Sequence, residues 1–161
     1  MTDPVLDIRD LKFRYADSSE AMANGAAASP WTVDVARLRV GTGQQVLLTG
    51  SSGMGKSTLL HLIAGLIEPQ QGVVTVAGRN MHELKGATRD TFRGRSIGMI
   101  FQTFNLLHGF SAEENVMAAL MFADPKRFPA KTHREHARGL LRELGLERPD
   151  AMPEQLSVGQ Q

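Results

Sequence analysis

The sequence predicts an α/β fold that opens with antiparallel strands, continues through a strand–loop–helix unit and ends in helices. Three observations support this prediction. Apolar residues alternate with polar ones before residue 40, a continuous apolar run precedes a glycine-rich loop near residue 50, and helical spacing dominates after residue 110. With 161 residues, the chain is long enough for one domain or most of one.

Composition excludes several classes of protein. Eighteen basic and seventeen acidic side chains leave a formal charge of +1, which gives no reason to expect a nucleic-acid partner. The absence of cysteine excludes disulfide frameworks and thiol catalysis. The N-terminus lacks the pattern of a secretory leader, and the most apolar run, Val116–Ala123, is far short of the roughly 20 residues that cross a bilayer. A soluble cytoplasmic domain is expected.

Two strands are expected first. The alternation from Leu6 to Tyr15 changes phase near Asp10, which predicts a strand with a bulge at that residue. A second alternating run, Trp31–Val40, follows the small and polar stretch Asp17–Pro30, which is typical of a surface loop. Two such runs joined by a loop predict an antiparallel pair.

The middle of the chain is expected to form a parallel-sheet core. Val46–Leu48 is a short apolar run of the kind found in strands covered on both faces. The helix after the glycine-rich loop is indicated by Leu59, Leu60, Ile63 and Ile67. Two further strands are expected at Val73–Val76 and Ile97–Phe101, with one short exposed helix within the charged stretch Met81–Arg93.

Two helices are expected in the second half. Ala112–Ala123 is preceded by Ser111, with Glu114 three residues later, which predicts a capping box. The prolines of Asp124–Lys131 then break the chain. The second helix, His133–Leu146, carries an apolar stripe formed by Ala137, Leu140, Leu141 and Leu144.

The glycine-rich loop is a phosphate-binding motif. Residues 50–58 read GSSGMGKST and match G-x-x-x-x-G-K-[ST], between an apolar strand and a helix. Lys56 would supply a point charge to the β- and γ-phosphates, the Ser57 hydroxyl suits Mg²⁺, and Thr58 would donate to the α-phosphate. The expected nucleotide contacts are Gly50, Ser51, Ser52, Gly53, Met54, Gly55, Lys56, Ser57 and Thr58. The alternative is a glycine-rich turn with one solvated lysine.

This motif alone does not identify the class of P-loop protein, because small GTPases, nucleotide kinases, recombinases and transporter ATPases share it. Three further features occur in order around it: Tyr15 in KFRY, Gln102 in MIFQTFNLL, and LSVGQQ at 156–161. With them, and with FNLLHGFSAEENV, the sequence resembles the nucleotide-binding subunit of an ATP-binding cassette (ABC) transporter. The pattern is most similar to the lipoprotein-release and macrolide-export branch.

The resemblance implies a P-loop NTPase cassette fold. Residues 1–101 would form the ATP-binding core with its antiparallel β subdomain, and 102–161 the Q-loop and the helical subdomain that ends in the signature motif. ATP and Mg²⁺ are the implied cofactors. Lys56 and Gln102 would act in catalysis, and Ser57 and Gln102 would contact the metal.

The resemblance also implies further nucleotide contacts. Tyr15 would stack on adenine, while Ser157, Gly159 and Gln160 would contact an ATP held by a second subunit packed head to tail. Val158 departs from the usual glycine of the signature, and its side chain crowds an approaching phosphate. Taken singly, Tyr15 is more typical of a strand end than of an adenine platform, and Ser157 with Gln160 is also typical of a helix capping box.

The implied function is ATP hydrolysis that powers export or extraction through a membrane permease, on the cytoplasmic face of the inner membrane. In the family, the magnesium aspartate, catalytic glutamate and switch histidine all follow the signature. Since nothing follows Gln161, the chain is expected to be a C-terminally truncated N-terminal fragment that hydrolyses ATP poorly by itself. Two alternatives stay open: a short non-hydrolysing nucleotide-binding regulatory module, and a soluble ABC-type ATPase without a permease.

Overall fold

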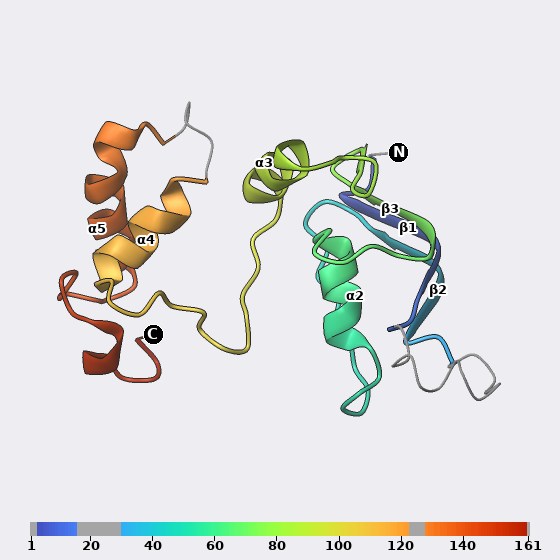
Figure 1. The fold of residues 1–161 in the computed structure, drawn as a ribbon, viewed down its shortest axis with the longest axis horizontal. Coiled ribbons are helices and arrows are strands. Elements are labelled where there is room, and N and C mark those ends of the chain that lie inside the picture. The colour runs from blue at the N-terminus through green and yellow to red at the C-terminus, as the bar shows by residue number, and fades with distance from the viewer. Residues whose placement is uncertain (1–2, 16–29, 123–127, 161) are drawn as a thin grey trace, which may run out of the picture. The chain divides into compact units, whose positions relative to one another are not determined.

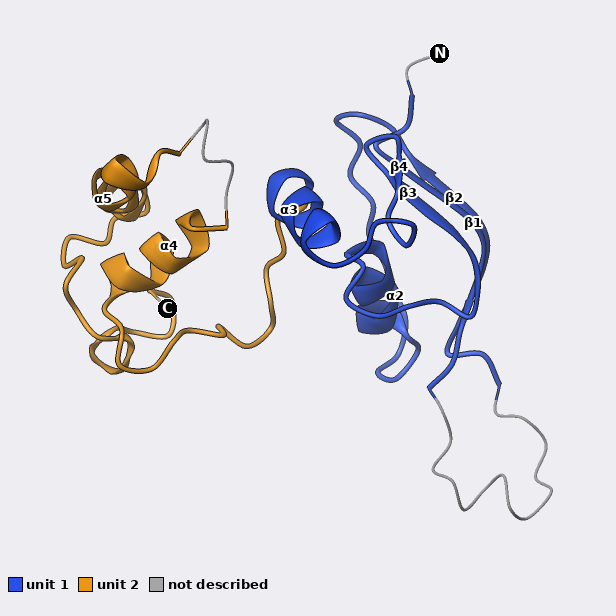
Figure 2. Cartoon of the chain, turned by 45° about the horizontal axis from the view of Figure 1, so that its top comes forward, with its two compact units in different colours: residues 1–96 blue, residues 97–161 orange. Residues whose placement is uncertain are grey.

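The structure is a computed structural model that describes residues 3–15, 30–122 and 128–160. The chain divides into two compact units, residues 1–96 (unit 1) and 97–161 (unit 2), as Figure 2 shows. The loop predicted at 17–30 lies outside the described residues except for Pro30, and the break predicted at 124–131 is described only from residue 128 onward. Each unit is described by itself below.

Unit 1 contains an antiparallel sheet of four strands, which are labelled in Figure 2. β1 (Leu6–Phe13) pairs with β2 (Val33–Val40) on one side and with β3 (Gln71–Val76) on the other. β4 (Arg79–Asn80) extends the sheet beyond β3, which gives the order β2-β1-β3-β4. The predicted antiparallel opening of the chain is therefore confirmed.

The bulge predicted near Asp10 is present. Asp10 has φ 48°, and the pairing of β1 with β3 changes register between Arg9 and Lys12. Gly72 fits against this bulge with φ +91°, and a Cβ at that position would lie 2.4 Å from the Asp10 carbonyl oxygen. Only glycine allows this close approach of the two backbones.

Two helices complete unit 1. α2 (Lys56–Ile63) follows the phosphate-binding motif and lies beside the sheet (Figure 1), and its Leu62 is fully buried. Ile8 and Val74, which face each other across β1 and β3, are also fully buried. α3 (Ala87–Ser96) buries none of its residues, as expected for an exposed helix.

Of the three strands expected in the middle of the chain, Val73–Val76 is formed as part of antiparallel β3, and the other two are not formed. Val46–Leu48 and Ile97–Phe101 are irregular, and Leu47 and Ile100 are exposed. A strand needs a neighbour that accepts and donates its backbone hydrogen bonds. In the described ranges, the four strands of the sheet pair with one another, and none pairs with these segments.

Unit 2 is built around two helices, α4 (Ala112–Leu120) and α5 (His133–Glu143), with single 3₁₀ turns at Ala130–Thr132 and Pro153–Gln155. The predicted capping box is confirmed, because Ser111 Oγ accepts from the Glu114 amide and the Glu114 carboxylate accepts from the Ser111 amide.

The apolar stripe predicted on α5 is only half buried. Ala137 and Leu141, four residues apart, are buried, whereas Leu140 and Leu144 are exposed. Leu140 and Leu144 lie four residues apart on the neighbouring face, which the fold of this unit leaves in solvent. The core cluster consists of Ala112, Leu141 and Leu146, with Val116 and Leu156 packed against it.

No helix among the described residues has the length and apolar character needed to cross a bilayer.

Candidate nucleotide-binding site

The phosphate-binding motif forms a turn that ends at the start of α2. Gly50, Gly53 and Gly55 all have positive φ values, and Gly55 is the N-cap residue of α2. A Cβ on Gly55 would lie 2.2 Å from the carbonyl oxygen of Thr32. The loop therefore packs directly against the backbone that leads into β2, which explains why a side chain is excluded at this position.

The Lys56 ammonium lies over the loop. Its Nζ donates to the carbonyl oxygens of Gly50, at 2.8 Å, and of Ser51, at 2.7 Å. The ammonium group is thus held at the loop by two neutral acceptors. A phosphate oxygen would be a stronger acceptor, because it carries negative charge.

The first turn of α2 presents backbone donors. The earliest helical bond runs from the Leu59 amide to the Gly55 carbonyl oxygen, at 2.8 Å, so the amides of residues 56–58 have no acceptor within the helix. None of the described side chains caps Gly55, and the first turn carries no acidic residue. These amides, together with the positive end of the helix dipole, are suited to an anion.

Tyr15 and Thr58 meet in this site. The Tyr15 hydroxyl lies 3.2 Å from the Thr58 Oγ1, although 43 residues separate them in sequence. Tyr15 is 55% exposed, and its ring packs edge-on against Phe13 with 4.9 Å between centroids. The aromatic residue at the end of the first strand therefore lies beside α2, with part of its ring accessible.

Ser57 is exposed in the first turn of α2, so its hydroxyl can reach a ligand. A hydroxyl oxygen is a hard ligand that fits Mg²⁺, which usually binds through few protein groups together with phosphate oxygens and water. Among the described residues there is no group of three His or acidic side chains that could hold a metal ion. The Ser57 hydroxyl would therefore suit a magnesium ion that is also bound by phosphate oxygens.

A cavity of about 210 Å³ lies next to the loop. It is lined by Met54, Gly55 and Lys56 of the motif and by residues 32–35 at the start of β2. The sequence did not predict a role for Thr32, because its contact with Gly55 is made by a backbone carbonyl. No side-chain pattern reveals such a contact.

The remaining predicted residues belong to unit 2. Gln102 is exposed in an irregular segment. Gln160 Oε1 accepts hydrogen bonds from the backbone amide and from the hydroxyl of Ser157, at 3.1 Å each. The backbone amide of Gln160 donates to the Ser157 carbonyl oxygen, at 2.8 Å. Gly159 is exposed in the same turn, as is Val158. The structure therefore gathers Tyr15 with residues 50–58 in unit 1, and Ser157, Gly159 and Gln160 in unit 2.

Comparisons with known proteins support the resemblance. The profile of the ABC transporter family matches residues 33–161. The macrolide export ATP-binding/permease protein MacB of Hyphomonas neptunium is 37% identical over all of this chain, which spans 23% of that protein. The lipoprotein-releasing system ATP-binding protein LolD of Syntrophotalea carbinolica is 41% identical over 77% of this chain and 54% of its own length.

The fold agrees with solved structures. A dimeric, post-hydrolysis state of the ATP-binding cassette MJ0796 bound to ADP and Pi superposes with a TM-score of 0.80 at 27% identity. The match covers 96% of this chain and 64% of that one, so the chain spans from about a quarter to less than two thirds of the relatives described here. Given the profile match, the similarity to LolD and MacB and the cassette fold, the chain belongs to the ABC transporter family.

Proposed function

We propose that this chain binds Mg-ATP through residues 50–58 and Tyr15. The observation that carries this proposal is the hydrogen bond between Tyr15 and Thr58, at 3.2 Å. Because Thr58 lies in the first turn of α2, an adenine stacked on Tyr15 would be close to the amides that receive the phosphates. Base, phosphates and Lys56 then fit in one continuous site.

We further propose that the whole protein hydrolyses ATP to power export or extraction through a membrane permease. The names of the relatives support this proposal, since one is a macrolide export protein and the other belongs to a lipoprotein-releasing system. Lys56 would hold the terminal phosphates, and Gln102 would contact the metal and the attacking water. The proposed location is the cytoplasmic face of the inner membrane.

A second copy would complete the site. The solved cassette with a similar fold is a dimer. In the proposed head-to-tail arrangement, Ser157, Gly159 and Gln160 of one subunit would contact the ATP bound at residues 50–58 of the other. Hydrogen bonds within the turn already fix the Ser157 hydroxyl and the Gln160 side chain. Loss of the terminal phosphate on hydrolysis would remove the charge that joins the two surfaces.

The direct test is substitution of Lys56 in the full-length protein. Lys56→Ala removes the ammonium group that lies on the Gly50 and Ser51 carbonyls, so the affinity for a fluorescent ATP analogue should fall at least about tenfold, the effect of losing one charge-assisted contact. Lys131→Ala, which removes an exposed lysine from unit 2, is the matched control and should bind as the wild type does. Equal affinity of the Lys56 and Lys131 variants would refute the assignment of the site.

A phosphate-release assay separates the proposed ATPase from the two alternatives. A transporter ATPase should release phosphate and co-purify from membranes with a multispanning partner. Binding without phosphate release would instead identify a regulatory module. Release without any membrane partner would identify a soluble ABC-type ATPase.

A further inference from the structure

A second cavity in unit 1 lies outside the nucleotide-binding site. Its volume is about 470 Å³, within the range of small-molecule sites. It is lined by the first residue of β4 and by one side of α3, with the residues Arg79, Ala87, Thr88, Thr91, Phe92 and Arg95. These residues do not overlap with residues 50–58 or with Tyr15.

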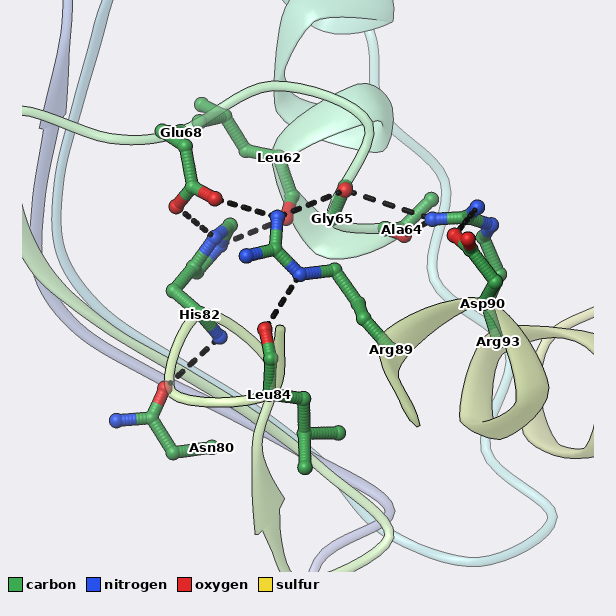
Figure 3. A network of polar contacts seen from close by, with 10 residues as sticks. All are labelled: Leu62, Ala64, Gly65, Glu68, Asn80, His82, Leu84, Arg89, Asp90 and Arg93. Atoms are coloured by element: carbon green, nitrogen blue, oxygen red, sulfur yellow. Dashed lines mark hydrogen bonds and ion pairs between the residues drawn. The ribbon is translucent and has the colours of Figure 1, made fainter. Parts of the chain in front are cut away.

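The opposite side of α3 is engaged in a separate polar network (Figure 3). Arg89 forms an ion pair with Glu68 and donates to the Leu84 carbonyl oxygen at 2.7 Å. Arg93 forms an ion pair with Asp90 at 2.5 Å and lies near the Ala64 and Gly65 carbonyls, at 3.4 and 3.5 Å. Arg89 and Arg93 are four residues apart and so share one face, which attaches α3 to the C-terminal end of α2.

The residues of α3 that line the cavity lie on a different stripe of the helix from Arg89 and Arg93. Thr88, Thr91 and Arg95 recur every three to four residues and therefore line one stripe along α3. Arg79 reaches the same cavity from β4, and its guanidinium lies 5.7 Å from the centroid of the Phe92 ring. Two arginines and two threonines thus line one space beside an aromatic ring.

Charge in this part of the chain is strongly asymmetric. Residues 79–96 contain five basic and two acidic side chains, a net +3, in a chain whose total is +1. Neither acid lines the cavity. Asp90 is paired with Arg93, and Glu83 accepts a hydrogen bond from Asn80 at 2.8 Å. The charged residues that line the cavity, Arg79 and Arg95, are both basic.

We propose that this cavity binds a phosphate ester, through Arg79, Arg95 and the hydroxyls of Thr88 and Thr91. One guanidinium group can donate to two phosphate oxygens at once, and threonine hydroxyls add neutral donors. The ring of Phe92 and the methyl group of Ala87 offer an apolar wall to the organic part of the ester. Soluble phosphate esters and the headgroups of anionic phospholipids share this chemistry.

The experiment uses the full-length protein with Lys56→Ala, so that the nucleotide site contributes little phosphate binding. Calorimetric titration with glycerol 3-phosphate tests the soluble source, and flotation with phosphatidylglycerol vesicles, compared with phosphatidylcholine vesicles, tests the membrane source. Binding should be detected in at least one arm. Adding Arg79→Gln and Arg95→Gln should weaken that binding at least about tenfold, as expected from the loss of two charge-assisted contacts.

Two further variants make the outcome specific. Arg37→Gln with Arg39→Gln removes the same charge from β2, at the other edge of the sheet, and should leave binding unchanged. Arg79→Lys with Arg95→Lys keeps the charge but loses the forked donors, and should recover part of the affinity and report on folding. The proposal is overturned if neither probe binds the parent protein, or if the β2 variant loses as much affinity as the cavity variant. Either failure leaves ATP binding by the wild type unaffected, so it is distinguishable from failure of the proposed function.

Discussion

Each unit buries a carboxylate, Asp7 in unit 1 and Glu113 in unit 2, but the two units differ in the apolar side chains around it. The largest fully buried residues of the described chain, Ile8, Leu11, Leu62, Val74 and Met81, all belong to unit 1. In unit 2, Glu113 and His133 are buried beside small residues such as Ala112 and Ala137. Large apolar side chains that are fully buried therefore contribute more to unit 1 than to unit 2.

Polar contacts are prominent in unit 2, where none of the largest fully buried apolar side chains lies. Glu113 in α4 forms ion pairs with Arg134, at 3.1 Å, and with Arg138, both on α5. The amides of Ala112 and Glu113 donate to the carbonyl oxygens of Ala151 and Pro149, at 2.8 and 2.7 Å. Such bonds contribute modestly one by one but fix the orientation of the groups that they join. Unit 2 illustrates how a pair of short helices is held by directional contacts.

The largest effect should come from a core substitution in unit 1. Leu62→Ala should lower the free energy of unfolding by about 2–5 kcal/mol, because it creates a cavity at a fully buried position next to the sheet. Leu141→Ala in unit 2 should cost less, since this side chain is 8% exposed and its cluster is smaller. Amide hydrogen exchange in the full-length protein measures the two units separately. A greater loss of protection from Leu141→Ala would break the comparison.

The elements that the sequence predicted well are those determined by neighbours along the chain. The bulge at Asp10 appeared as a change of phase, and the capping box at Ser111 as a pair of residue types three positions apart. The phosphate-binding motif likewise depends on glycine at fixed spacing before α2. Each of these features is encoded within fewer than about ten residues, which is why it could be predicted.

The predictions that were wrong concern features that depend on partners elsewhere in the chain. The apolar run Val46–Leu48 has the composition of a buried strand, but composition does not provide the neighbouring strand that would pair with it. Leu140 and Leu144 repeat at helical spacing as well as Ala137 and Leu141 do, and only the tertiary packing selects the second pair. The contact of Gly55 with Thr32 and the approach of Tyr15 to Thr58 are tertiary in the same sense.

A smaller effect is expected at the buried carboxylate of unit 2. Glu113→Ala should reduce the stability of this unit by about 1–2 kcal/mol, because it removes hydrogen bonds to two guanidinium groups that are more than half exposed and can be solvated again. The control is Glu143→Ala, which removes an exposed carboxylate from α5 and should change stability by less than about 0.5 kcal/mol. Hydrogen exchange of α4 and α5 provides the measurement. Equal effects of the two variants would show that the ion pairs do not stabilise unit 2.

A comparable or smaller effect is expected at the start of α4. Ser111→Ala removes the acceptor for the Glu114 amide and should cost about 0.5–2 kcal/mol, the usual effect of losing an N-cap. Exchange protection should fall at residues 112–115 and remain unchanged in unit 1. Unchanged protection at α4 would indicate that the Ala151 and Pro149 carbonyls suffice to hold this end of the helix.

The same cap should respond to pH. The hydrogen bond from the Ser111 amide holds the pKa of Glu114 below its ordinary value of 4.5, and the Ser111 hydroxyl adds to this effect. A carboxylate whose pKa is lower in the folded state stabilises that state above pH 4.5, and this contribution disappears as the pH falls through the folded pKa. Glu114→Gln, which keeps an acceptor oxygen but no charge, should therefore differ from the wild type at neutral pH and converge with it in acid. Exchange of the α4 amides over that range measures the convergence, and a difference that persists in acid would place the stabilisation in something other than the carboxylate charge.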